Sequence, residues 1–226
     1  VTGEDHRFLT LQGWKFVTGT CQGRHRRRHL TTNDSLLGVG AFAEGPEFSN
    51  GYRRGYLGGM IRGDGHLASY HYERKGRAHG SQHQFRLALA DREALERSGR
   101  YLRDFGIRTG RFSLQEAVGA RRPIEAVRTR APADVGRVRE IIAWPEAPDD
   151  AWWKGFLAGI FDAEGSFSDD ALRFSDTDPD LLGRIRRGLD RFDFEAALED
   201  RSVVGAASTV RVRGGLREHL RFFHTV

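Results

Sequence analysis

Two carboxylates, Asp64 and Glu164, occupy equivalent places in a segment that the chain contains twice. Gly55-Tyr-Leu-Gly-Gly-Met-Ile-Arg-Gly-Asp-Gly65 recurs 100 residues later as Gly155-Phe-Leu-Ala-Gly-Ile-Phe-Asp-Ala-Glu-Gly165, and each acid directly precedes the last glycine. Two carboxylates held side by side repel each other, and a divalent cation with oxygen ligands relieves the repulsion. At the floor of a basic groove, the expected chemistry of such a pair is metal-assisted hydrolysis of a phosphodiester.

The glycines of the repeated segment predict how the acids meet. Gly55 and Gly59, like the matching pair in the second copy, are one helical turn apart, so each helix has a flat stripe along which another backbone can approach. In a single helix such a stripe usually indicates packing alone, but its duplication with a terminal acid favours a metal-binding pair. We expect Asn50 and Asp150 to cap the two helices, and the final glycines to end them.

The repeat continues downstream with an offset of 87 residues, so that Leu95 aligns with Leu182 and Phe105 with Phe192. Alternation of apolar and polar residues over 82–89 predicts a strand with one buried face. Each copy is read as helix, two strands, helix, two strands, helix. The predicted fold class is therefore α+β, with tandem pseudo-twofold repeats, two curved antiparallel sheets and the glycine-bearing helices at the interface. Further helices are expected at 91–105, 135–144 and 178–192.

The domain organisation follows from the repeat. Residues 1–49 lie outside it and are expected to form a hairpin or two and a flexible basic arm. The first copy covers 50–144, a linker covers 145–150, and the second copy covers 151–226. We expect this second copy to be incomplete at its C-terminal end.

Charge and composition narrow the class of partner. The 226 residues carry a net charge of +5, and only three of the 36 basic residues are lysines, so the positive charge comes from guanidinium groups suited to phosphates and guanine edges. Residues 51–150 carry 19 basic and 13 acidic side chains, against 11 and 13 in residues 151–226. No membrane-spanning or secretion segment is recognised, and a single cysteine excludes a disulfide framework. We therefore expect an intracellular protein that binds nucleic acid mainly through its first copy.

The two motifs resemble those of a monomeric LAGLIDADG homing endonuclease. The resemblance covers about residues 50–226. It implies two αββαββα halves that form a saddle over double-stranded DNA, and cleavage of both strands within a long site by a monomer. It also implies that Asp64 and Glu164 bind the catalytic metal with the backbone carbonyls of Gly63 and Ala163. The implied cofactor is Mg²⁺ or Mn²⁺, with Ca²⁺ able to bind without supporting cleavage.

The residues expected to contact DNA follow from strand parity and from the resemblance. They lie on the strand faces turned away from the helices and in the basic loop of the first copy. They are Arg74, Lys75, Arg77, Gln82, Gln84, Arg86, Arg128, Arg130, Arg173, Ser175, Arg211 and Arg213.

Two departures and two alternative functions remain open at the level of sequence. Arg62 stands where the first motif commonly has an acid; this position is not the metal ligand, so little effect on cleavage is expected. The family usually has a basic residue, often a lysine, near the scissile phosphate. No lysine lies in the matching part of the first copy, so Arg128 and Arg130 are the candidates here. The alternatives are a LAGLIDADG RNA maturase and a non-cleaving DNA-binding regulator; retention of both acids argues against the regulator.

The N-terminal segment, residues 1–17, resembles a fragment of the self-splicing Hint fold of inteins. Splicing needs a nucleophile at the first residue and a His-Asn pair at the end, whereas this sequence begins with Val1 and ends in His224-Thr-Val226. Splicing is therefore not expected, and descent from an intein is the hypothesis that the resemblance supports.

Overall fold

The chain divides into two compact units, Val1–Phe42 and Ala43–Val226. The computed structural model describes residues 6–22, 25–37, 44–71, 80–119, 122–168, 170–199 and 207–226. The smaller unit contains two hairpins, β1 (Arg7–Thr10) with β2 (Gly13–Phe16) and β3 (Cys21–Gln22) with β4 (His25–Arg26). The segment predicted to be a flexible arm thus contributes a strand. Arg27 there donates to the Thr18 carbonyl, and its guanidinium lies 4.3 Å from the Phe16 ring centroid.

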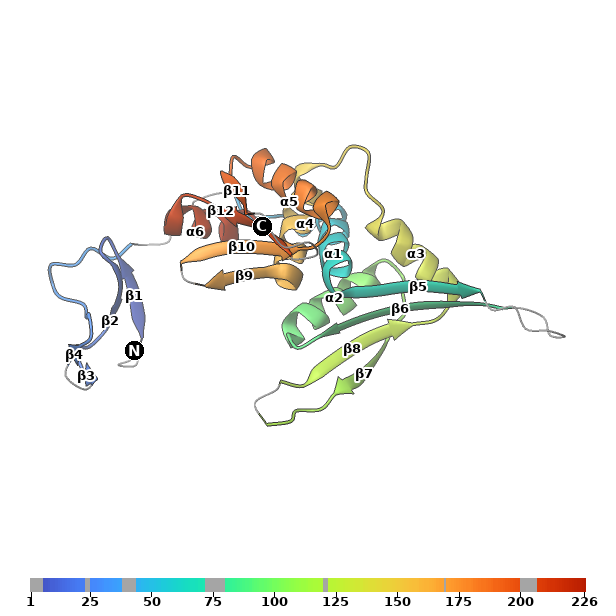
Figure 1. The fold of residues 1–226 in the computed structure, drawn as a ribbon, viewed down its shortest axis with the longest axis horizontal. Coiled ribbons are helices and arrows are strands. Elements are labelled where there is room, and N and C mark those ends of the chain that lie inside the picture. The colour runs from blue at the N-terminus through green and yellow to red at the C-terminus, as the bar shows by residue number, and fades with distance from the viewer. Residues whose placement is uncertain are drawn as a thin grey trace. The chain divides into compact units, whose positions relative to one another are not determined.

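The larger unit has two halves with the same order of elements (Figure 1). The first half comprises α1 (Asn50–Asp64), β5 (Gly65–His71), β6 (Ser81–Leu89), α2 (Arg92–Asp104), β7 (Gly110–Gln115), β8 (Ile124–Thr129) and α3 (Pro132–Ile142). The second comprises α4 (Asp150–Glu164), β9 (Gly165–Ser168), β10 (Ala171–Asp176), α5 (Pro179–Arg191), β11 (Ala196–Glu199), β12 (Ser208–Val212) and α6 (Gly215–Thr225). The predicted α+β class and the predicted order of elements are confirmed.

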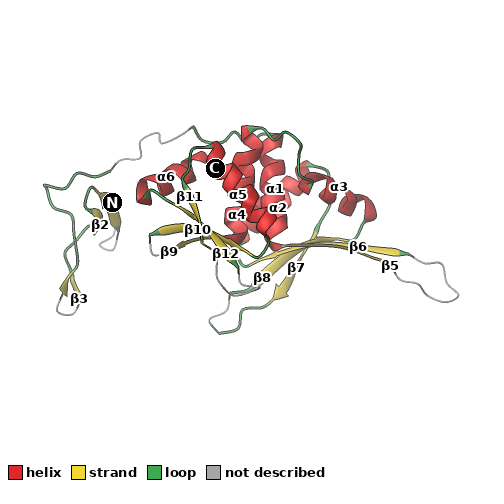
Figure 2. Ribbon diagram, turned by 45° about the horizontal axis from the view of Figure 1, so that its top comes forward, coloured by secondary structure: helices red, strands yellow, loops and turns green. Residues whose placement is uncertain are grey.

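Each half contains one four-stranded antiparallel sheet, in the order β5-β6-β8-β7 in the first half and β9-β10-β12-β11 in the second. In both sheets the first strand follows directly from the helix that carries the acid. Figure 2 shows the helices on one side of the two sheets, so that the opposite faces of the strands are not covered by helices.

Local sequence explains where the helices begin. Asp91 and Asp178 cap α2 and α5 through their side chains, as expected. The predicted caps of the motif helices are wrong by one residue, since Ser49 accepts a hydrogen bond from the Tyr52 amide and Asp149 from that of Trp152. Helix α3 starts three residues before its predicted limit because Pro132 occupies its first turn, where a missing amide hydrogen costs nothing.

Helices α1 and α4 pack backbone to backbone along their glycines. A Cβ atom on Gly59 would lie 2.5 Å from the Phe156 carbonyl oxygen and 2.5 Å from the Ile160 amide nitrogen. Such positions admit only glycine, because the obstructing atoms belong to main chain that cannot rotate away. The predicted contact between the two glycine stripes is confirmed.

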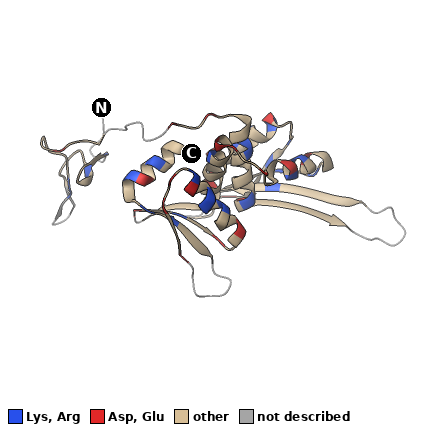
Figure 3. Ribbon diagram, turned by 90° about the horizontal axis from the view of Figure 1, so that it is seen from above, with Lys and Arg blue, Asp and Glu red and all other residues tan. Residues whose placement is uncertain are grey.

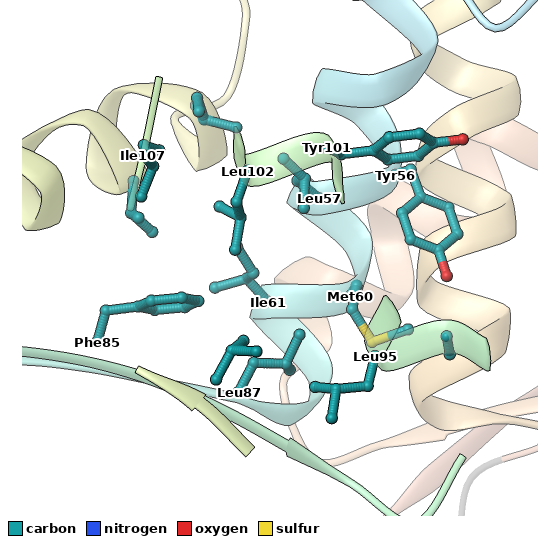
Figure 4. Close-up of a cluster of buried hydrophobic side chains, with 14 of the residues drawn as sticks. Tyr56, Leu57, Met60, Ile61, Phe85, Leu87, Leu95, Tyr101, Leu102 and Ile107 are labelled. Atoms are coloured by element: carbon teal, nitrogen blue, oxygen red, sulfur yellow. The ribbon is translucent and has the colours of Figure 1, made fainter. Parts of the chain in front are cut away.

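Each half has its own hydrophobic core between its helices and its sheet. In the first half, Figure 4 shows Tyr56, Leu57, Met60 and Ile61 of α1 facing the side chains of the sheet and of α2. Phe85 is among the sheet residues that are fully buried. Burial of each such side chain stabilises the fold by about 1.5–3 kcal/mol. The cores hold both sheets against the two motif helices, which fixes the strands relative to the acids.

Candidate functional site

Asp64 and Glu164 are the last residues of α1 and α4. The two helix ends meet, since a Cβ atom on Gly63 would lie 2.6 Å from the Ala163 Cβ atom and 3.0 Å from the Glu164 Cγ atom. The structure therefore brings together the two acids that the sequence singles out, and with them Gly63 and Ala163.

No cation of the described residues pairs with the carboxylates of Asp64 and Glu164. Among the described residues, neither Asp64 nor Glu164 forms a hydrogen bond or ion pair through its side chain. Partial desolvation where the helices meet raises the pKa of Asp64. Desolvation also raises the pKa of Glu164, and the negative charges of Asp176 and Asp64 raise it further. An ionised pair in this place is destabilised until a cation joins it.

The acid pair fits a Mg²⁺ or Mn²⁺ ion that takes its remaining ligands from elsewhere. The described part of the chain brings no third His, Cys, Asp or Glu into a metal-binding cluster with two others. Mg²⁺ keeps several waters and is commonly held by one or two carboxylates together with substrate phosphates. The donor set of Asp64 and Glu164 is therefore suited to a metal completed by a phosphodiester.

Asp162 and Arg62, two positions before the acids, are both held by hydrogen bonds. Asp162 acts as an acceptor and Arg62 as a donor. Asp162 accepts hydrogen bonds from the Tyr56 hydroxyl at 2.6 Å and from Arg97 at 3.0 Å. Arg62 donates to the Ile142 carbonyl at 2.7 and 3.2 Å. These side chains are engaged in packing, whereas the acids that follow them are left without a partner.

The uncovered face of the first sheet carries a column of polar residues. Phe85, Leu87 and Leu89 are buried on the helix side of β6, as strand parity predicts, so Gln82, Gln84 and Arg86 occupy the other face. Arg86 lies directly opposite Arg128 of β8, which is exposed. Arg130 follows β8 and lines a hollow of about 350 Å³ with Gln82 and Gln84 among others.

The second sheet repeats this layout. Leu172 and Phe174 are buried on the helix side of β10, which leaves Arg173 and Ser175 on the uncovered face. Arg173 lies opposite Arg211, and Ser175 opposite Thr209 with 2.9 Å between their hydroxyl oxygens.

The arginines of the second sheet differ in being held by neighbours. Arg211 pairs with Glu199 at 2.5 Å, Arg213 with Glu195 at 3.0 Å, and Arg173 donates to the Ser168 carbonyl at 3.0 Å. By contrast, Arg86 and Arg128 have no acidic partner in the described ranges.

Some of the basic residues on the helices pair with acids. Figure 3 shows Lys and Arg interspersed with Asp and Glu along the helices. Arg97 pairs with Glu93 on α2, and Arg191 of α5 with Asp150 of α4. Arg86 and Arg128 differ from these arginines in their placement, because they lie directly opposite each other in the sheet, where two like charges are destabilising.

Three of the predicted DNA-contacting residues, Arg74, Lys75 and Arg77, lie outside the described residues. Sequence reasoning missed others that share the uncovered face. His66 lies opposite Arg86, and Tyr70, which is 41% exposed, lies opposite Gln82. Counting alternate residues from Gly65 could have assigned both side chains to this face. It could not have told which residues of β6 lie opposite them, because that depends on the register between β5 and β6. Sequence reasoning also missed Asp176, whose charge acts on Glu164. In the repeat alignment Asp176 stands where the first copy has the buried Leu89, so the one available signal was an acid at a position expected to be apolar.

Comparison with known proteins defines the class to which this arrangement belongs. Residues 152–225, in the second half of the chain, match the model of the LAGLIDADG-like domain. No curated protein sequence shows a significant match.

Solved structures extend the likeness across both halves. The homing endonuclease I-DmoI is similar with a TM-score of 0.60 at 17% identity, over 78% of this chain and 96% of that one. I-DmoI in complex with DNA and Mn matches equally well, over 79% of this chain and 97% of that one. The N-terminal LAGLIDADG domain of DUF199/WhiA is similar with a TM-score of 0.55 at 16% identity, over 78% and 81%. The expected two-motif LAGLIDADG fold is thus confirmed. No described helix is long and apolar enough to cross a membrane.

Proposed function

We propose that this protein is a homing endonuclease that cleaves both strands of a long double-stranded DNA site as a monomer, with Mg²⁺ or Mn²⁺ as cofactor. The observation that carries the proposal is the acid pair at the ends of α1 and α4. No cation of the described residues pairs with it, and the strands beside it carry arginines on their uncovered faces. The fold shared with I-DmoI supports it, since that endonuclease has been described in complexes with DNA and Mn, and with DNA and Ca.

The acids would hold the metal together with the backbone carbonyls of Gly63 and Ala163. When bound, such an ion supplies Lewis-acid stabilisation of the scissile phosphate and activation of a water molecule. Asp64 and Glu164 must both be ionised to act as ligands. The close contact between the helix ends places the two carboxylates beside each other.

The strands position the substrate. Cross-strand pairs of like charge are formed by Arg86 with Arg128 in the first sheet and by Arg173 with Arg211 in the second. Their rows include His66 and Ser166, which come two residues after the acids. A phosphate between the two guanidiniums of a pair offsets their repulsion, and a guanine edge can accept two hydrogen bonds from either one. We assign the role of the missing active-site lysine to Arg86 and Arg128. Among the described residues no acid pairs with them, so a phosphate would not have to displace one.

The proposal is tested by selecting DNA duplexes from a randomised pool with the full chain in Ca²⁺, then exchanging Ca²⁺ for Mg²⁺. Breaks in both strands of the selected duplex support the proposal. Duplexes that are bound but stay intact in both Mg²⁺ and Mn²⁺ refute cleavage and favour a DNA-binding regulator. Selection of structured RNA in place of duplex DNA favours a maturase. Descent from an intein is a separate part of the proposal, supported by the resemblance of residues 1–17 to the Hint fold.

A further inference from the structure

The interface between the halves is fastened near Glu164 by an ion pair. Tyr56 of α1 and Arg97 of α2 both donate to one carboxylate oxygen of Asp162, at 2.6 and 3.0 Å. Asp162 belongs to α4 and lies two residues before Glu164. Two elements of the first half are thereby bound to the last turn of a helix of the second half.

The pseudo-twofold related position contains two cations. The offset of 100 residues relates Asp162 to Arg62, and the offset of 87 residues relates Arg97 to Arg184. Where one side of the interface has an aspartate facing an arginine, the other has two arginines. The charges of Asp178 and Asp180 act on Arg62 and Arg184, respectively, but neither acid forms an ion pair with these arginines among the described residues. Left alone, the two arginines would push α1 and α5 apart close to Asp64.

A tryptophan from the connection between the halves contacts both cations. The guanidinium carbons of Arg62 and Arg184 lie 3.9 and 4.0 Å from the ring centroid of Trp144. The indole face is electron-rich and attracts a cation, most strongly where water is excluded. The ring also packs edge-on against Phe156 of α4, 5.5 Å between centroids, and Arg62 is further held by the Ile142 carbonyl.

We propose that Trp144 takes the place of the absent carboxylate, and that Trp144 and Arg62 are positioning residues for Asp64. Their contact fixes the last turn of α1 against α4 and α5, as the Asp162–Arg97 ion pair fixes the last turn of α4. The connection between the halves is therefore part of the site architecture as well as a tether. The part of this inference that concerns cleavage rests on the proposed function; the contact itself does not.

A double-mutant cycle on the full chain tests the contact. Trp144→Leu lowers the midpoint of thermal unfolding, because the two guanidiniums then face each other across an aliphatic side chain. Arg62→Asp also lowers the midpoint in the wild-type background, because it removes the contact between the Arg62 guanidinium and the Trp144 ring. In the Trp144→Leu background, Arg62→Asp raises the midpoint, because the new carboxylate pairs with Arg184. Additive effects, with Arg62→Asp equally destabilising in both backgrounds, overturn the inference.

Trp153→Leu provides the matched control. Trp153 packs against Trp152 and Phe156, and within the described residues its ring stands over no guanidinium. Combination of Arg62→Asp with Trp153→Leu should be additive. If Trp144→Leu does not fold, Trp144→Phe takes its place. A phenyl face attracts cations less strongly than an indole face, so Arg62→Asp should be less destabilising in the Trp144→Phe background than in the wild type; equal destabilisation in the two backgrounds counts against the contact.

Positioning is tested by single-turnover cleavage with protein in excess, alongside DNA affinity in Ca²⁺. We expect Trp144→Leu to lower the cleavage rate constant at least several-fold while the DNA affinity changes little, and Arg62→Asp to restore much of the rate in that background. A loss of stability alone reduces the fraction of active protein but not this rate constant. An unchanged rate constant overturns the positioning role. Absence of cleavage by the wild-type protein refutes the proposed function, and the unfolding cycle still decides whether the contact exists.

Discussion

Substitution of Gly59 by alanine tests the backbone contact on which the acid pair depends. The new Cβ atom would lie 2.5 Å from both the Phe156 carbonyl oxygen and the Ile160 amide nitrogen, whereas ordinary contacts begin at 3.4 Å. To relieve this overlap, α1 and α4 must separate locally by about 0.9 Å, and a gap of that size forfeits a quarter to a half of the dispersion energy of the atoms that line it.

The magnitude follows from two opposing terms. Overpacking of a closely packed interior typically costs about 1–3 kcal/mol and sometimes more, and here the obstructing atoms are main chain. Alanine regains at most about 1 kcal/mol through helix propensity. We therefore expect Gly59→Ala to reduce the free energy of unfolding by about 2 kcal/mol, which corresponds to a loss of about 4–8 °C in Tm for a chain of this size.

The adjacent residue provides the control. A Cβ atom on Gly58 meets nothing closer than the Trp152 ring at 3.8 Å, an ordinary contact. Gly58→Ala should accordingly stabilise the protein by up to about 1 kcal/mol. Urea unfolding followed by circular dichroism measures both variants. Equal stability of the two variants would refute the backbone-to-backbone packing of the motif helices.

Three further predictions concern the site. The pKa values of Asp64 and Glu164 are raised in the folded protein, so their ionisation destabilises it above those pKa values and the penalty is relieved as the pH falls through them. Calorimetry should therefore show that Mg²⁺ raises Tm at pH 7, and that this rise in Tm becomes smaller as the pH falls toward the ordinary carboxyl range. Asp64→Asn should raise Tm in the absence of metal. A rise in Tm with Mg²⁺ that persists at pH 4 would contradict the assignment of Asp64 and Glu164 as metal ligands. Arg86→Ala should weaken DNA binding and reduce the slope of log K against log salt by about 1, as fluorescence anisotropy can measure; an unchanged slope would exclude a phosphate contact. A structure bound to DNA should show more phosphate contacts from residues 51–150 than from residues 151–226, and the reverse distribution would contradict the charge layout.

The sequence predicted the fold well because the information was periodic and duplicated. Two copies of one motif set the order of the elements, and alternation over Phe85, Leu87 and Leu89 set the buried face of β6. Errors arose where a decision rested on one residue. Ser49 rather than Asn50 caps α1, since both types can accept the amide hydrogen bonds and the sequence does not choose between them.

The acid pair was predictable, but its surroundings were not. Asp64 and Glu164 are related by the repeat itself, so one alignment finds both. Their neighbours depend on packing between segments that are distant in sequence. The negative charge of Asp176 raises the pKa of Glu164 because the fold of β10 places the two carboxylates near each other. Trp144 contacts Arg62 of the first half and Arg184 of the second, so this contact depends on both halves. Contacts of this kind require coordinates because no local pattern encodes them.

Cleavage of one selected duplex by four proteins in Mg²⁺ tests the central claim most directly. The wild-type chain and Asp176→Asn, which alters a nearby carboxylate outside the assigned ligand pair, are expected to break both strands. Asp64→Asn and Glu164→Gln are expected to bind the same duplex with little loss of affinity and to leave it intact. Cleavage at the wild-type rate by either of the last two variants would show that the carboxylates at the ends of α1 and α4 do not hold the catalytic metal.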